Sequence, residues 1–212
     1  MPGVTISAGY GAGGSIIAPA VAKLLGLPLL DRAISSRVAA QLQVSVREAE
    51  GGAVKRSGPG RFLSMLAPLA SGVLGAGTDC APPEAVALLD DAAAFREQAE
   101  AIMRTALATG AVILGRAGGA AFHAEPQVLR VRLFGPEQAR IAQAARIEDV
   151  DAATARQRLP EVDRARAQYV WRLYNVDIDD PDLYHLQIDS TVVPLDACAD
   201  LIASAYLGRV RP

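Results

Sequence analysis

Short apolar runs alternate along this chain with longer segments in which apolar residues recur every three or four positions. The short runs have the length of strands that are buried on both faces, and they span residues 3–7, 27–30, 111–114, 129–134 and 186–189. The longer segments have the period of amphipathic helices, and they span residues 16–25, 33–50, 84–109, 136–147, 151–174 and 194–207. Strands that alternate with helices predict an α/β fold whose mostly parallel sheet is covered on both faces.

The regular pattern fails over residues 50–83, which are rich in glycine, alanine and proline. We expect a mobile insert there, although its apolar segment 62–66 could form a short helix against a pocket or against a second copy of the chain. Further on, Pro160 predicts an interruption or a kink in the helix over 151–174. The length of 212 residues fits one domain over 1–212 with such an insert.

Composition narrows the class of protein. Hydrophobic residues make up 51% of the chain, which is enough for a sizeable core. The net charge of −2 argues against binding nucleic acid by broad electrostatic attraction. The chain has neither an apolar stretch of membrane-spanning length nor the pattern of a secretory leader, so we expect a cytoplasmic protein without membrane contact. Its two cysteines and two histidines do not have the spacing of a zinc site.

The most distinctive stretch is the glycine-rich segment at residues 9–15, Gly-Tyr-Gly-Ala-Gly-Gly-Ser, between the first strand and the first helix. The backbone amides of such a loop converge with the helix N-terminus on a point where an anion can bind. Glycines permit positive φ angles and let a phosphate approach without meeting a Cβ atom. The segment therefore predicts a phosphate-binding loop.

The sequence leaves three interpretations of this loop open. As G-x-G-x-x-G from residue 9 it matches the dinucleotide-binding fingerprint, with Asp31 near the position of the ribose-binding acid. As a P-loop it places Ser15 at the magnesium-binding hydroxyl. Two positions then depart from the P-loop consensus, since Ala8 replaces the first glycine and Gly14 replaces the lysine. The third interpretation is an ordinary glycine-rich turn between a strand and a helix.

Charged residues follow two of the predicted strands. Asp31 comes directly after the strand at 27–30, and Arg116 comes two residues after the strand at 111–114. The carboxyl ends of parallel strands are where open α/β proteins bind ligands. Asp31 could equally be the N-cap of the helix that follows it, whereas solvation alone does not explain an arginine that ends a buried strand.

Five segments carry a family resemblance: residues 6–14 (ISAGYGAGG), 25–32 (LGLPLLDR), 111–116 (AVILGR), 162–169 (VDRARAQY) and 180–190 (DPDLYHLQIDS). In this order they resemble the cytidylate kinase-like family of P-loop nucleoside monophosphate kinases. The resemblance implies a three-layer P-loop kinase-like fold with a five-stranded parallel sheet and an arginine-bearing helical lid over 136–175. It also implies nucleotide substrates, a monophosphate-binding region within 50–83, and ATP and Mg²⁺ as cofactors.

Mapped onto this chain, the resemblance assigns roles to individual residues. The residues expected to hold the phosphate donor are Gly9, Gly11, Ala12, Gly13, Gly14, Ser15 and Arg140. Ser15 and Asp31 would serve the magnesium ion, and Asp31 would also lie near the acceptor. Arg116 would grip the α-phosphate of the acceptor, while Arg164 and Arg166 in the lid would close over the transferring phosphoryl group.

The chain departs from the family pattern at two places. Gly14 removes the lysine that ordinarily reaches the β- and γ-phosphates, and Ala117 and Gly118 stand where an acidic residue ordinarily follows glycine-arginine. Either an arginine replaces the lysine, or catalysis is weak or lost. The lid arginines also have a plainer interpretation as surface residues, with Asp163 paired to Arg166 along one helix.

Three functions are compatible with these observations. The first is ATP-dependent phosphoryl transfer to a nucleoside monophosphate, with (d)CMP or a related pyrimidine nucleotide as the acceptor. The second is a catalytically weak or inactive nucleotide-binding or regulatory protein that keeps the pocket. The third is a nicotinamide-dependent oxidoreductase, against which the chain shows no second mononucleotide-binding half and no catalytic Tyr-Lys or His-Asp set. A homodimer is compatible with each of them.

Overall fold

A computed structural model describes residues 3–31 and 92–210 of the 212-residue chain. The predicted insert at 50–83 and the predicted helix over 33–50 lie outside the described residues, as does the first part of the predicted helix over 84–109.

Five strands form one sheet in which every pairing is parallel, as predicted. The sheet has the order β2-β3-β1-β4-β5, and its strands are β1 (Val4–Ala8), β2 (Leu29–Leu30), β3 (Val112–Leu114), β4 (Leu129–Phe134) and β5 (Leu186–Asp189). Because β1 pairs with β3 on one side and with β4 on the other, it is the central strand. The glycine-rich segment therefore begins at the middle of the carboxyl edge of the sheet.

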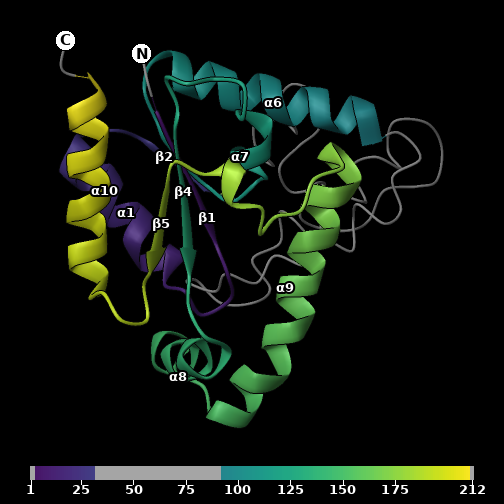
Figure 1. The fold of residues 1–212 in the computed structure, drawn as a ribbon, viewed down its shortest axis with the longest axis vertical. Coiled ribbons are helices and arrows are strands. Elements are labelled where there is room, and N and C mark those ends of the chain that lie inside the picture. Colours follow the sequence, from purple (N-terminus) through teal and green to yellow (C-terminus); the bar gives the residue numbers. More distant parts are fainter. Residues whose placement is uncertain (1–2, 32–91, 211–212) are drawn as a thin grey trace, which may run out of the picture.

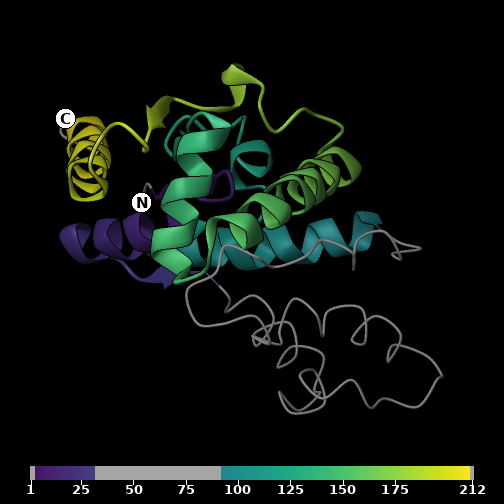
Figure 2. The same cartoon turned by 90° about the horizontal axis from the view of Figure 1, so that it is seen from below.

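Helices cover both faces of this sheet (Figure 1). On one face lie α1 (Gly14–Leu25) and α10 (Leu195–Val210), which pack against each other. On the other face lie α6 (Ala92–Ala108), the short α7 (Gly118–Ala121) and α9 (Ala152–Tyr174), and Figure 2 shows the two groups on opposite sides. Helix α8 (Glu137–Glu148) lies beyond the carboxyl end of β4, and a one-turn 3₁₀ helix, η1 (Pro181–Leu183), precedes β5. The three-layer α/β architecture is thus confirmed.

Helix α9 continues without a break through Pro160, so of the predicted interruption or kink the interruption is wrong. Pro160 is exposed, but its neighbour Leu159 is buried in a cluster that contains Ile141 of α8. A proline inside a helix costs about 3 kcal/mol or more, through a lost backbone hydrogen bond and a steric clash, and burial of a leucine side chain offsets about 1.5–3 kcal/mol of that cost. Packing between α8 and α9 therefore keeps the helix continuous across the proline.

None of the helices within the described part of the chain is both long and apolar enough to cross a membrane.

Strand β4 alternates apolar and basic residues, and the two kinds serve opposite faces of the sheet. Leu129, Val131 and Leu133 join the core that α1 and α10 cover. Arg130 and Arg132 are nevertheless buried, with exposed fractions of 5% and 8%. The Arg130 guanidinium donates to backbone carbonyls of η1 and of the residue that follows α7, and burial lowers the pKa of Arg130. Arg130 is thus a structural residue, whereas Arg132 belongs to the site described below.

Two glycines in helices have opposite surroundings, and the same substitution should change stability in opposite directions. A Cβ atom on Gly118 would lie 2.8 Å from the Thr5 Cβ atom, because α7 packs directly on β1, while a Cβ atom on Gly208 would meet nothing within 4 Å. We expect Gly118→Ala to lower the free energy of unfolding by about 1–3 kcal/mol. Gly208→Ala should raise it by about 0.5 kcal/mol, since alanine is the better helix former. Urea denaturation measures both, and a neutral Gly118→Ala would contradict the packing described.

Candidate functional site

The glycine-rich loop joins β1 to α1 in a conformation that requires glycine at two positions. Gly11 and Gly13 have φ angles of 74° and 72°, in the left-handed region. A Cβ atom on Gly11 would lie 2.2 Å from the carbonyl oxygen of Arg140, and one on Gly13 would lie 2.7 Å from a methyl carbon of Leu195. Backbone angle and lack of space thus both exclude larger residues here. Gly13 also ends the loop as the N-cap of α1.

The carbonyl groups of this loop are bound by side chains from elsewhere in the chain. Arg140 donates from Nη1 to the carbonyl of Tyr10 at 2.9 Å, and Gln143 donates from Nε2 to that of Gly11 at 3.0 Å. The Ser190 hydroxyl donates to the carbonyl of Ala12 at 2.7 Å. Gln143 and Ser190 are buried, so these bonds are shielded from water. Three successive carbonyls are therefore held by the protein.

Most of the loop amides, in contrast, have no acceptor. Within residues 3–31 and 92–210, no hydrogen bond engages the backbone N–H groups of Gly11, Gly13, Gly14 or Ser15. The last two lie in the first turn of α1, where a helix leaves its amides unpaired and has a partial positive charge. A loop whose carbonyls are bound and whose amides are open is suited to an anion.

A cavity of about 280 Å³ opens beside the start of this loop. Ala8 and Gly9 form part of its wall, and the strand, helix and loop segments around it contribute charged side chains. These side chains are Arg132 of β4, Arg140 of α8, Asp163 and Arg166 of α9, and Asp179 from the segment before η1. Guanidinium groups outnumber carboxylates in this wall, which favours an anionic occupant.

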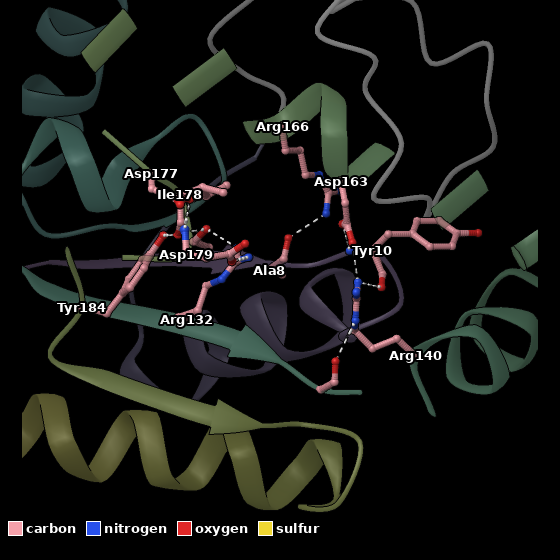
Figure 3. Close-up of polar contacts among 12 residues, drawn as sticks. Ala8, Tyr10, Arg132, Arg140, Asp163, Arg166, Asp177, Ile178, Asp179 and Tyr184 are labelled. Carbon is pink, nitrogen blue, oxygen red and sulfur yellow. Dashed lines mark hydrogen bonds and ion pairs between the residues drawn. The ribbon is translucent and has the colours of Figure 1, made fainter. Parts of the chain in front are cut away.

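The arginines of the cavity are held in place by polar contacts that Figure 3 shows. Arg140 and Asp163 form an ion pair with 2.7 Å between Nη1 and Oδ2. Arg132 lies 2.5 Å from a carboxylate oxygen of Asp179 and also donates to the Ser7 hydroxyl at 3.0 Å. Arg166 donates from Nη1 to the carbonyl of Ala8 at 2.7 Å. Three arginines from three different elements thus converge at the carboxyl ends of β1 and β4.

Asp163 contacts Arg140 and the loop instead of Arg166, so the interpretation of Asp163 and Arg166 as a surface pair along α9 is wrong. Its Oδ1 atom accepts from the Tyr10 amide at 2.8 Å, and its Oδ2 atom accepts from Arg140. The reason is orientation, because the polar groups of α9 at this point face α8 and the loop.

Arg116 lies at the carboxyl end of β3 and is absent from the wall of the cavity. Arg116 and Ala117 have φ angles of 58° and 56°, which non-glycine residues rarely adopt. Arg116 is half-buried, and it makes no hydrogen bond or ion pair with any described residue. Burial raises the pKa of Tyr169 on α9, and the charge of Arg116 opposes that rise, so the guanidinium lies near α9.

The structure does not bring Arg164 and Asp31 to the cavity. Arg164 is exposed on α9, although Arg166 two residues further on lines the wall. Asp31 follows β2, the edge strand, and β3 separates β2 from β1. At about 4.8 Å between neighbouring strands, Asp31 starts about 10 Å away from the strand that leads into the loop.

Several residues of this site had no role in the expectations from the sequence: Arg132, Gln143, Asp163 as a loop ligand, Asp179 and Ser190. One signal was present, because a strand that alternates leucine or valine with arginine at 129–134 places basic residues on a buried face. The loop contacts of Gln143, Asp163 and Ser190 join segments more than 100 positions apart and have no local signature. Asp179 lies 47 positions from its partner Arg132.

Removing the Asp163 carboxylate should destabilise the protein. Asp163→Ala leaves the Tyr10 amide and the largely buried Arg140 charge without their shared acceptor. We expect a loss of about 2 kcal/mol in the free energy of unfolding. Asp200→Ala on the exposed surface of α10 is the control and should change stability by less than about 0.5 kcal/mol. Equal urea midpoints for the two variants would contradict the role of Asp163.

Comparison with known proteins places the chain in a family. The model of the cytidylate kinase-like family matches residues 3–192. An uncharacterized protein from Eubacterium ventriosum has the same fold, with a TM-score of 0.60, 17% identity and 98% of each chain covered. A Thermus thermophilus protein matches with a TM-score of 0.50 and 17% identity, covering 100% of this chain and 99% of that one. A shikimate kinase from Acinetobacter baumannii in complex with shikimate matches with a TM-score of 0.46 and 15% identity, covering 100% of this chain and 96% of that one.

No curated protein sequence matches the chain. The family model, however, spans nearly the whole sequence, and the five parallel strands and the loop after β1 agree with the fold expected from the resemblance. The chain therefore belongs to the cytidylate kinase-like family and has a kinase-like phosphotransferase fold.

Proposed function

We propose that the protein transfers the γ-phosphoryl group of ATP to a nucleoside monophosphate, and that the acceptor is (d)CMP or a related pyrimidine nucleotide. The observation that carries the proposal is the loop over residues 9–15, whose open amides lie at the N-terminus of α1. An arginine-lined cavity begins at the same loop. Phosphoryl transfer depends mainly on alignment and on positive charge around the transferring oxygens, and both are available here.

The donor would lie with its phosphates on the amides of Gly11, Gly13, Gly14 and Ser15. The site also suits Mg²⁺, because the Ser15 hydroxyl is half-buried in the first turn of α1 and has no partner among the described residues. Those residues contain no cluster of three or more His, Cys, Asp or Glu side chains suited to a metal. That agrees with Mg²⁺, which binds through one or two protein oxygens together with substrate phosphates. The ion would neutralise charge on the donor phosphates.

The charge of the lysine that Gly14 replaces would come from guanidinium groups. Arg132 and Arg166 line the cavity beside Ala8 and Gly9, where the chain enters the loop. Arg140 has a different task, since it contacts the carbonyl of Gly135, the carbonyl of Tyr10 and Asp163, and so holds the loop. We assign Arg166 and Arg132 to the transferring phosphoryl group and Arg140 to the shape of the donor site.

Arg116 would bind the phosphate of the acceptor. Its left-handed backbone, together with that of Ala117, costs on the order of 1–3 kcal/mol per residue, and such strain is concentrated at functional sites. The guanidinium has no hydrogen-bond or ion-pair partner among the described residues. Arg116 follows β3, the neighbour of the central strand, at the edge of the sheet where ligands of α/β proteins bind. Asp31 on the neighbouring edge strand would lie on the acceptor side, and residues 50–83 would supply the rest of the monophosphate site within a single domain.

A nucleotide-binding protein without catalysis is the second candidate. It is favoured by Gly14, which removes the usual cation from the loop, and by Ala117, which stands where an acidic residue ordinarily follows glycine-arginine. The amide cradle alone supports this candidate as well as the first.

A panel of acceptors separates the two candidates. We expect the protein, with ATP and Mg²⁺, to release ADP fastest when CMP or dCMP is present and much more slowly with purine monophosphates or without an acceptor. A coupled assay for ADP measures this, and calorimetry with ATP in the same buffer measures binding. Binding of ATP without release of ADP for any acceptor would support the second candidate and refute the first.

The arginines should differ in their effect on turnover. We expect Arg116→Ala and Arg166→Ala each to lower kcat/KM at least about 100-fold, because each removes positive charge from a phosphate group. Arg164→Ala should change kcat/KM less than about threefold, since Arg164 is exposed and outside the cavity. Arg146→Ala, on the exposed side of α8, is the control for removal of a surface charge. Equal losses for Arg164→Ala and Arg166→Ala would refute the assignment of Arg166.

A further inference from the structure

Tyr10, the second residue of the glycine-rich loop, is fully buried between the two helices that follow β4. Its ring packs in a cluster with Ile141 and Ala144 of α8 and with Ala155 and Leu159 of α9. A tyrosine in a turn at the edge of a sheet would ordinarily be exposed. Here the loop inserts its one aromatic side chain into the seam between α8 and α9.

The hydroxyl of Tyr10 joins a charged network within that seam. It donates to Oε2 of Glu148 at 2.9 Å, and Arg158 of α9 lies 2.8 Å from the same oxygen. The Glu148 side chain is only 4% exposed. A largely buried carboxylate that accepts two hydrogen bonds is stable only while its partners remain, so the three groups hold one another in position.

The backbone of Tyr10 is bound by the same two helices. Its amide donates to Asp163 of α9 at 2.8 Å, and its carbonyl accepts from Arg140 of α8 at 2.9 Å. Figure 3 shows these contacts on one side of the residue while the ring points away from them. Side chain and main chain of a single loop residue are thus fixed by α8 and α9.

We propose that Tyr10 is a positioning residue for phosphate binding, through which the α8–α9 pair fixes the directions of the open amides of residues 11–15. The inference rests on the proposed function for its ligand, ATP. Four of the seven loop residues are glycines, and ordering such a segment when the ligand arrives would cost conformational entropy. An anchored loop avoids that cost, because its amides are oriented before the phosphates arrive.

Tyr10→Phe tests this inference with the smallest possible change, because it removes only the hydroxyl group that donates a hydrogen bond to Glu148. Tyr174→Phe is the control, since burial and the nearby charge of Glu100 raise the pKa of Tyr174 near the end of α9, but its ring packs in the separate cluster on α6. Tyr10→Leu, which also removes the ring, extends the series. The readouts are the Kd for ATP with Mg²⁺, the separate values of KM and kcat, and hydrogen exchange, in the protein without nucleotide, of the loop amides at residues 10 and 12, which are hydrogen-bonded to Asp163 and to the Gly9 carbonyl.

We expect Tyr10→Phe to raise the Kd and the KM for ATP about fivefold while kcat changes less than about twofold, as for a lost hydrogen bond that only pre-orients the site. Exchange of the hydrogen-bonded amides at residues 10 and 12 should become faster by a similar factor, and Tyr10→Leu should show larger effects in the same direction. Tyr174→Phe should change none of these quantities, even if it lowers the melting temperature as much as Tyr10→Phe does.

Unchanged exchange of the amides at residues 10 and 12 in Tyr10→Phe would overturn the inference, and so would faster exchange with an unchanged Kd for ATP. An effect of the same size in Tyr174→Phe would also overturn it, because the change would then follow from stability alone. Failure of the proposed function looks different: the unaltered protein would release no ADP with any acceptor, while the exchange rates of the amides at residues 10 and 12 would still respond to Tyr10→Phe.

Discussion

The site depends on how the polar groups of one short loop are divided between protein and ligand. The carbonyls of Tyr10, Gly11 and Ala12 each accept a hydrogen bond from a side chain, whereas four amides of the same segment have no acceptor among the described residues. Because every unpaired polar group that is shielded from water is costly, bound carbonyls and open amides leave the loop in need of an anion. The donors Arg140, Gln143 and Ser190 are therefore as much part of the site as the glycines.

Placing positive charge at this edge of the sheet has an electrostatic cost that acidic side chains offset. The side chains of Arg132 and Arg140 are largely buried, and each is paired with an aspartate, Asp179 or Asp163. A buried arginine without such a partner needs other acceptors, as Arg130 has in backbone carbonyls, because an unpaired buried charge is strongly destabilising. The pairs keep guanidinium groups near the loop in the absence of a ligand, and arginine forks suit phosphate oxygens as well as carboxylates.

The absence of an acidic residue after Arg116 has a packing explanation. Arg116 and Ala117 turn the chain sharply in left-handed conformations, and Gly118 then packs against Thr5 without room for a Cβ atom. Helix α7 can lie directly on β1 only because a glycine occupies that position. The geometry that presents Arg116 at the end of β3 thus depends on small residues where a longer acidic side chain would be expected.

The sequence by itself determined the strands, most helix bounds in the described parts and the glycine-rich loop, because these depend on local periodicity and on the conformational freedom of glycine. The sequence did not determine which charged side chains contact one another at the site. Arg164 and Arg166 are alike in sequence, yet only Arg166 lines the cavity, since the orientation of α9 depends on packing against α8 and Tyr10. Contacts such as Tyr10 with Asp163 join positions 153 residues apart, so only the tertiary structure could decide them.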